Sequence, residues 1–151
     1  MIDLPDLNLP SYKLRTRILN NKMQIFGNIR KKYVYLTLEE WVRQNFILYL
    51  HNEKDYPLSL MMVEVQVPYN RLKTRADIVL YNTDRNPIMI VECKSPDVKI
   101  TQETFYQFAK YNYKLKTELL VVTNGLQHFC CRINYQNHEN LFLNEIPSYL
   151  K

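Results

Sequence analysis

The sequence predicts an α/β fold in which a mixed central sheet is flanked by helices. Two segments with helix-start signals, 37–53 and 101–116, alternate with short apolar runs bounded by turn residues. The resulting order is helix, three strands, helix, two strands. Because a helical crossover joins parallel strands and short turns join antiparallel ones, this order gives a mixed sheet. The nearly continuous apolar character of the middle strands indicates that helices cover both faces of that sheet.

The N-terminal region is expected to lie outside this sheet. Two prolines and scattered leucines in the first 12 residues favour an extended arm, and the pair Asn20-Asn21 suits the turn of a hairpin. We therefore expect one domain in three parts: an N-terminal arm and hairpin over 1–35, a core over 36–134, and a short amphipathic closing segment over 135–151.

The core begins with a helix over 37–53. Thr37 is the expected N-cap and Glu40 lies three residues later, which is the spacing of a capping box. Three strands are then expected, over 60–67 with Pro68 ending the strand, from Ala76 to residue 82, and over 88–94. The turn between the last two, with Asp84, Asn86 and Pro87, makes them an antiparallel hairpin.

A second helix over 101–116 is expected to connect the hairpin to two further strands. Thr101 can cap this helix. The strand over 118–125 follows the helical crossover and should therefore run parallel to the strand before it. The segment 128–135 should pair with it across the turn at Gly125.

Composition excludes several classes of protein. Hydrophobic residues make up 46% and charged residues 23%, as in globular domains. The two glycines are too far apart for a phosphate-binding loop, so no nucleotide-driven motor is expected. Three cysteines without metal-site spacing indicate reduced thiols. The start of the chain lacks a signal-peptide pattern and no apolar run approaches the roughly 20 residues of a membrane span, so we expect a cytoplasmic protein without a membrane partner.

The charge of the chain favours a polyanionic partner. The net charge is +5 and the pI about 9.0. Basic residues gather in three groups: Lys13, Arg15 and Arg17; residues 30–32; and Arg71, Lys73 and Arg75. The last group precedes Asp77 and can be either a solvated turn or a clamp for DNA phosphates.

Three charged side chains should converge at one end of the predicted hairpin. Glu92 and Lys94 are two positions apart in a strand and therefore share a face. Pairing about the turn near residue 85 places Asp77 opposite residue 93, or beside Glu92 or Lys94 after a slip of one position. Cross-strand neighbours lie about 5 Å apart. Each of these charges alone can be explained by a surface ion pair.

Divalent-metal hydrolysis of phosphodiesters is the chemistry that needs this grouping. Mg²⁺, or Mn²⁺ in its place, takes carboxylate and carbonyl oxygens and keeps several waters. Asp77, Glu92 and the backbone carbonyl of Cys93 are candidate metal ligands. Lys94 can hold or deprotonate the attacking water and stabilise charge on the phosphate.

The segment "RADIVLYNTDRNPIMIVECKSP" resembles the D…ExK signature of the PD-(D/E)xK nuclease superfamily. More narrowly, the chain is similar to stand-alone relatives of the nuclease domain at the N-terminus of type I restriction enzyme R subunits. "TLEEWVRQ" resembles the first core helix of that family, "QFAKY" its QxxxY element, and "VVTNG" the strand that follows. Ala76 stands where the superfamily name has proline. The resemblance covers roughly residues 25–130.

The resemblance implies a restriction-endonuclease-like sandwich with metal-dependent DNA cleavage as its activity. Asp77 and Glu92 would bind the metal, Lys94 would be catalytic, and Glu40 would lie near the metal, although the capping box also explains Glu40. Gln107 and Tyr111 would face the site, although packing of a half-buried helix also explains them. The expected partner is DNA, within a homodimer that cuts both strands or a larger restriction complex.

Two alternatives remain open at this point. A non-catalytic DNA-binding module, serving as one subunit of a restriction or defence assembly, would keep the fold without turnover. RNA could replace DNA as the substrate. The presence of Asp77, Glu92 and Lys94 together favours the enzyme.

Overall fold

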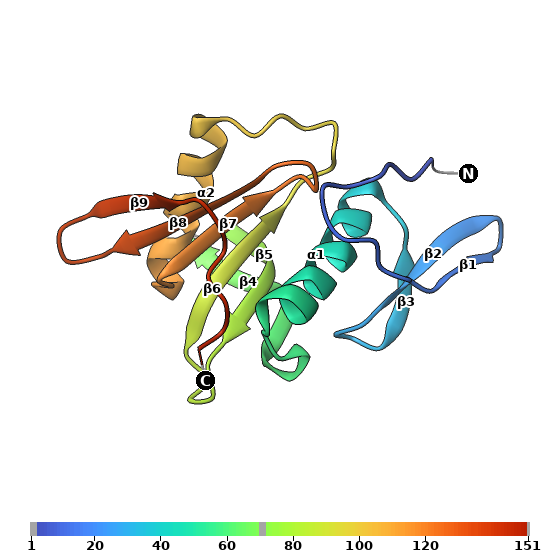
Figure 1. Cartoon of the computed structure of the whole chain (residues 1–151), viewed down its shortest axis with the longest axis horizontal. Helices are drawn as coiled ribbons and strands as arrows, with labels where there is room; N and C mark the ends of the chain where they lie inside the picture. Colours follow the sequence, from blue (N-terminus) through green and yellow to red (C-terminus); the bar gives the residue numbers. More distant parts are fainter. Residues whose placement is uncertain (1–2, 70–71, 151) are drawn as a thin grey trace.

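The computed structural model describes residues 3–69 and 72–150, apart from the side chains of residues 68–69, 72–74 and 111–114. A six-stranded sheet forms the centre and a three-stranded sheet lies beside it (Figure 1). The central strands are β4 (Met61–Tyr69), β5 (Leu72–Tyr81), β6 (Pro87–Cys93), β7 (Leu119–Thr123), β8 (His128–Asn134) and β9 (Glu139–Leu143), adjacent in that order. β6 and β7 are parallel and the other neighbours antiparallel. The prediction of a mixed sheet is confirmed.

The helices α1 (Leu38–Lys54) and α2 (Gln102–Leu115) pack on opposite faces of the central sheet. Successive strand residues alternate between the two cores, which explains the continuous apolar runs. The core with α1 contains Phe46, Ile78, Val91 and Val121. The core with α2 contains Phe108, Val79, Ile90 and Leu120.

Both predicted helix caps are present. The Thr37 hydroxyl accepts the backbone N–H of Glu40 at 3.0 Å, and the Thr101 hydroxyl accepts that of Thr104 at 3.2 Å. The first helix ends at Asp55, whose φ of 66° is the left-handed conformation of a helix C-terminus. A short 3-10 helix, η1 (Leu58–Leu60), then leads into β4.

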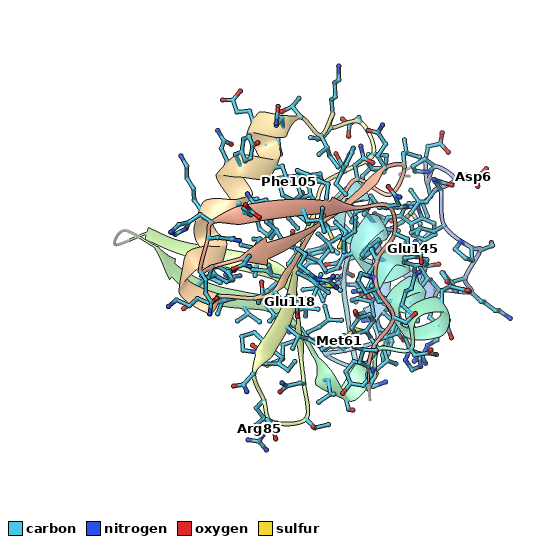
Figure 2. The ribbon with its side chains drawn as sticks, turned by 60° about the vertical axis from the view of Figure 1, so that its left-hand side comes forward. Asp6, Met61, Arg85, Phe105, Glu118 and Glu145 are labelled. Carbon is cyan, nitrogen blue, oxygen red and sulfur yellow. The ribbon has the colours of Figure 1, made fainter. Side chains whose placement is uncertain are left out.

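The prediction that Pro68 ends the first core strand is wrong. Strand β4 continues to Tyr69, and Pro68 pairs with Lys73 of β5. Because β4 is an edge strand of the sheet, a residue without an N–H can be accommodated there. The β4–β5 hairpin is therefore longer than expected at its basic end. At the other end of β5, Arg85 marks the tip of the turn to β6 (Figure 2).

The N-terminal hairpin is present and gains a third strand. β1 (Thr16–Leu19) and β2 (Lys22–Gly27) are joined by Asn20 and Asn21, both at positive φ, and β3 (Lys32–Tyr35) completes the sheet. The preceding arm lies against the core, where the N–H of Asn8 donates to the carbonyl of Gly125 at 2.8 Å.

The closing segment is also more structured than expected. Its first part forms β9 on the edge of the central sheet. The chain then returns to the end of α1, where the N–H of Tyr149 donates to the carbonyl of Lys54 at 2.8 Å. Across residues 3–69 and 72–150, no helix is long and apolar enough to cross a membrane.

Candidate functional site

The carboxyl groups of Asp77 and Glu92 meet across the β5–β6 hairpin. Ile78 pairs with Val91, so the next step of the same register places Asp77 opposite Glu92. Asp77 is 8% exposed, and its Oδ2 accepts the backbone N–H of Cys93 at 2.7 Å. A hydrogen bond also joins the two carboxyl groups. The sequence left open whether Asp77 lies opposite residue 93 or, after a slip of one position, beside Glu92 or Lys94. The strand register places it beside Glu92.

Burial and mutual repulsion make this pair of carboxyl groups hold a proton. Burial, followed by the charge of Asp77, raises the pKa of Glu92 to about 8. Burial also raises the pKa of Asp77, although the Cys93 N–H and Arg43 oppose the rise. At neutral pH the pair therefore favours holding a proton between its two carboxyl groups.

Lys94 completes the group just beyond the end of β6. Its Nζ lies 3.3 Å from Glu92 Oε1, and its backbone N–H donates to the carbonyl of Thr123 on β7 at 2.8 Å. Burial disfavours its charge, but Glu92, Glu39 and Asp77 outweigh burial and raise the pKa of Lys94. The ammonium is therefore charged at neutral pH and one third exposed, at 34%.

Cys93 packs on the other face of the strand from Glu92. Its side chain is fully buried in the core beneath α1, and burial raises the pKa of the thiol well above its ordinary value. A buried, protonated thiol is a poor nucleophile, so the side chain of Cys93 has a packing role. The predicted use of its carbonyl as a metal ligand stays a prediction.

The first turn of α1 contributes an acidic residue that the sequence reading missed. Glu39 is exposed at the helix start. Partial burial of its carboxyl group and then the charge of Asp77 raise its pKa, while Lys94 lowers it, so Glu39 is coupled electrostatically to both residues. Glu40 instead contacts its own helix: its Oε2 accepts from Gln44 Nε2 at 3.0 Å and lies 3.0 Å from Arg43 Nε. The prediction that Glu40 lies near a metal stays a prediction, and these contacts favour Glu39.

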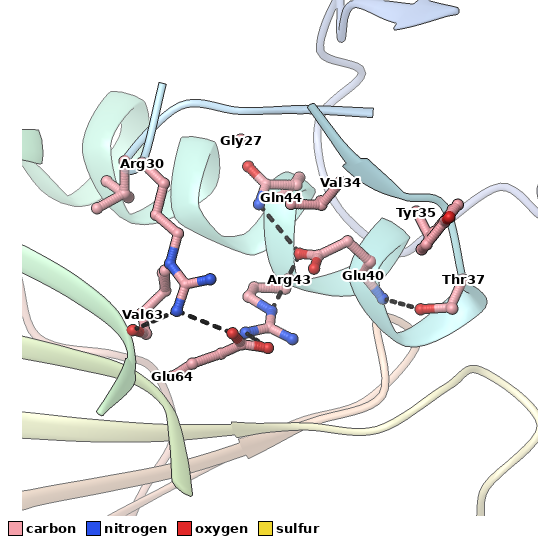
Figure 3. Close-up of a pocket in the computed structure, with 11 residues that line it drawn as sticks. Gly27, Arg30, Val34, Tyr35, Thr37, Glu40, Arg43, Gln44, Val63 and Glu64 are labelled. Carbon is pink, nitrogen blue, oxygen red and sulfur yellow. Dashed lines mark hydrogen bonds and ion pairs between the residues drawn. The ribbon is translucent and has the colours of Figure 1, made fainter. Parts of the chain in front are cut away.

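A buried arginine links α1 to the carboxylates. The Arg43 side chain is 8% exposed, with Nη2 4.0 Å from Asp77 Oδ1 and Nη1 3.6 Å from Glu64 Oε1. The ion pair of its Nε with Glu40 is short but does not have hydrogen-bond geometry. Figure 3 shows Arg43 between Glu40 and Glu64, with Arg30 on the far side of Glu64. These residues line a cavity of about 270 Å³ between β2–β3, α1 and β4.

Glu64 adopts an unusual backbone conformation beside this site. Its φ is 52° within β4, and the flanking pairs Val63–Ile78 and Val65–Ala76 place it opposite Asp77. A non-glycine residue at positive φ in a strand costs on the order of 1–3 kcal/mol and is held by its surroundings. The holding contacts are the ion pairs with Arg30 at 2.8 Å and with Arg43.

The remaining predicted site residues are not brought into this group by contacts that the structure describes. Gln107 is exposed on α2, and no hydrogen bond or ion pair within the described part of the chain joins it to Lys94. Tyr111 lies in α2, but its side chain is outside the described residues, as is that of Lys73 in β5. Arg71 lies outside the described residues altogether, and Arg75 is exposed opposite Gln66.

The two buried carboxyl groups suit a divalent cation. They offer hard oxygen ligands whose repulsion a cation would relieve in place of the proton. Among the described residues, no three His, Cys, Asp or Glu side chains form a metal-binding cluster. A metal here would therefore take two carboxylates and complete its shell with water and backbone oxygen, as Mg²⁺ commonly does.

Comparisons with known proteins place the chain in a family. Residues 38–147 match the family model described as type I restriction enzyme R protein N terminus (HSDR_N). A fragment described as the HsdR subunit of a type I restriction enzyme from Vibrio vulnificus YJ016 has a similar fold, with a TM-score of 0.53 and 20% identity. The match covers 75% of this chain and 24% of that one, so the chain spans about a quarter of that structure's length. No curated protein matched the sequence.

The family match bears out the resemblance read from the D…ExK segment, and it contains Asp77, Glu92 and Lys94. It also contains both helices and the whole central sheet. The chain belongs to the family of type I restriction enzyme R protein N termini.

Proposed function

We propose that the chain is a Mg²⁺-dependent nuclease domain that hydrolyses phosphodiester bonds of DNA. One observation carries the proposal: buried Asp77 and partly buried Glu92 lie opposite each other, with Lys94 Nζ 3.3 Å from Glu92 Oε1. Two repelling carboxyl groups and an adjacent ammonium are costly as a purely structural feature. They are suited to a site that binds a cation and an anionic phosphate together.

Each residue then has a distinct part in the reaction. Asp77 and Glu92 would hold the metal, which when bound would polarise the phosphate and activate a water. Lys94, charged at neutral pH, would bind a phosphate oxygen and stabilise the charge that develops there, rather than remove a proton. Glu39 would hold a water of the metal shell, and Arg43 would position Asp77.

The arrangement of helices and strands supports a restriction-endonuclease-like sandwich as the finer description of the fold. The site lies where the β5–β6 hairpin meets the N-terminal turn of α1. We further propose that the domain works on DNA as part of a restriction complex, or as a homodimer that brings two sites to the two strands. Gln107, Tyr111 and the basic end of the β4–β5 hairpin remain candidate DNA contacts.

The test is nicking of supercoiled plasmid in Mg²⁺ or Mn²⁺. Asp77→Asn and Lys94→Gln should each reduce the nicking rate by at least about 100-fold, and EDTA should abolish nicking by the wild type. Asp84→Asn is the matched control, because Asp84 is an exposed carboxylate in the β5–β6 turn. Equal nicking by all four proteins would point to a contaminating nuclease. DNA binding by the wild type without any nicking would favour a non-catalytic binding module.

A further inference from the structure

All of the net positive charge of the chain comes from one N-terminal segment. Residues 7–37 contain seven lysines and arginines and no aspartate or glutamate, whereas the rest of the chain has 13 lysines and arginines against 15 aspartates and glutamates. The segment forms β1, β2 and β3 and lies ahead of the family match at 38–147. All seven basic side chains are exposed: Lys13, Arg15, Arg17, Lys22 and residues 30–32.

The cations on the outer face of this small sheet are held over aromatic rings. Ile25 is fully buried and faces the body of the molecule, so its neighbour Phe26 lies on the outer face. The contacts are Arg15 over Phe26 and Arg17 over Tyr33, each at 3.9 Å, and Lys22 over Tyr35 at 5.2 Å. Such contacts fix the position of a cation without neutralising it.

Carboxylates do not balance this charge. Of the seven basic residues, only Arg30 has a carboxylate within ion-pair distance among the described residues. Its partner is Glu64, which lies opposite Asp77. In Figure 1 the small sheet projects beyond α1, on the side away from β8 and β9. The other six basic residues therefore have no carboxylate partner among the described residues, and Arg30 connects the small sheet to the candidate site through Glu64.

We infer that the outer face of β1–β3 binds the phosphate backbone of the DNA substrate and holds it beside Asp77 and Glu92. The inference rests on the proposed function for the choice of DNA. Guanidinium groups held over rings can present N–H edges to phosphate oxygens. Arg17 Nε donates to Gln24 Oε1 at 2.7 Å, so the terminal nitrogens of Arg17 are the ones that would reach a phosphate. Cations of this kind contact backbone phosphates, so we expect the face to bind DNA regardless of sequence.

The test measures binding of a fluorescent DNA duplex by anisotropy, without divalent cations, across a series of salt concentrations. Arg15→Gln with Arg17→Gln should weaken binding about 10–100-fold near 0.1 M salt and reduce the slope of log K against log salt by about 2. Arg85→Gln with Lys116→Gln is the matched control, because it removes the same charge from exposed positions away from β1–β3. This control should change the DNA affinity and the salt slope much less.

Further variants separate the inference from folding defects and from the proposed function. Arg15→Lys with Arg17→Lys keeps both charges and should bind within about 3-fold of the wild type. Asp77→Asn should bind normally while failing to nick. The inference would be overturned if Arg15→Gln with Arg17→Gln bound DNA as tightly as the wild type, or if this double variant and the control double variant lost affinity equally. Stronger competition by duplex RNA than by duplex DNA would also overturn it. If only Arg15→Gln with Arg17→Gln loses DNA binding, the result would support the inference even if the wild type nicked no plasmid.

Discussion

Glu92 should make the stability of the metal-free protein depend on pH. Its pKa rises from the ordinary 4.5 to about 8 on folding, so the native state holds a proton that the unfolded chain loses within this window. The contribution of Glu92 to the free energy of unfolding is therefore greatest below pH 4.5 and falls as the pH rises towards 8. The loss is at most about 1.4 kcal/mol, or about 4 °C in Tm, per pH unit. The Tm of Glu92→Gln between pH 5 and 8 should be much less dependent on pH, and an unchanged slope would contradict the buried-proton assignment.

Two adjacent glutamates of α1 should behave differently when neutralised. Glu39→Gln should lower the nicking rate about 10–100-fold at an almost unchanged Tm, because Glu39 is coupled to Asp77 and Lys94. Glu40→Gln should lower the free energy of unfolding by about 2 kcal/mol, because buried Arg43 loses its nearest carboxylate. Nicking rates and thermal melts of both variants decide the matter. If Glu40→Gln instead lost nicking and Glu39→Gln lost stability, Glu40 would be the residue near the metal.

The sequence located some residues of the candidate site better than others. Asp77, Glu92 and Lys94 lie in two adjacent strands joined by a short turn, so the period of two and the turn predict their meeting. Glu39, Arg43 and Glu64 come together only through packing of α1 on the sheet. The stripe of α1 formed by Arg43, Phe46 and Leu50 reaches Glu39 if it is continued to the helix start, where Glu39 is exposed.

At the scale of the elements, α1 should depend on its cap. Thr37→Ala removes the hydroxyl that accepts the N–H of Glu40 at 3.0 Å. The expected cost is about 1 kcal/mol, or about 3 °C in Tm. Nicking should also fall, since fraying of the first turn displaces Glu39. Thr37→Ser keeps the acceptor and should restore both. A Tm of Thr37→Ala equal to that of the wild type would mean that packing alone fixes this helix start.

The elements with strong local signals were predicted correctly, namely both helices and the core strands from β4 to β8. Strands β3 and β9 were missed, because each lies on a sheet edge and is largely exposed, without the apolar pattern that marks a buried strand. The length of the β4–β5 hairpin was missed because Pro68 was read without knowing that β4 is an edge strand.

The whole molecule divides its tasks between two sheets. The central sheet, within the family match, carries the acidic pair and Lys94. The N-terminal sheet, ahead of that match, carries the unbalanced positive charge. Arg30, Glu64 and Arg43 connect the two through ion pairs that end at Asp77. This connection makes both sheets part of one proposed DNA-cleaving surface, although the two proposed carboxylate ligands of the metal lie in the central sheet.

The central claim is that Asp77 and Glu92 bind a divalent cation in place of their shared proton. Calorimetric titration with Mn²⁺ at pH 7, repeated in two buffers of different ionisation enthalpy, measures the metal bound and the protons released. The wild type and Asp84→Asn should bind with release of about one proton per metal, as expected when Glu92 ionises, and Asp77→Asn should lose this binding. Equal binding by Asp77→Asn and the wild type, or binding without proton release, would contradict the claim.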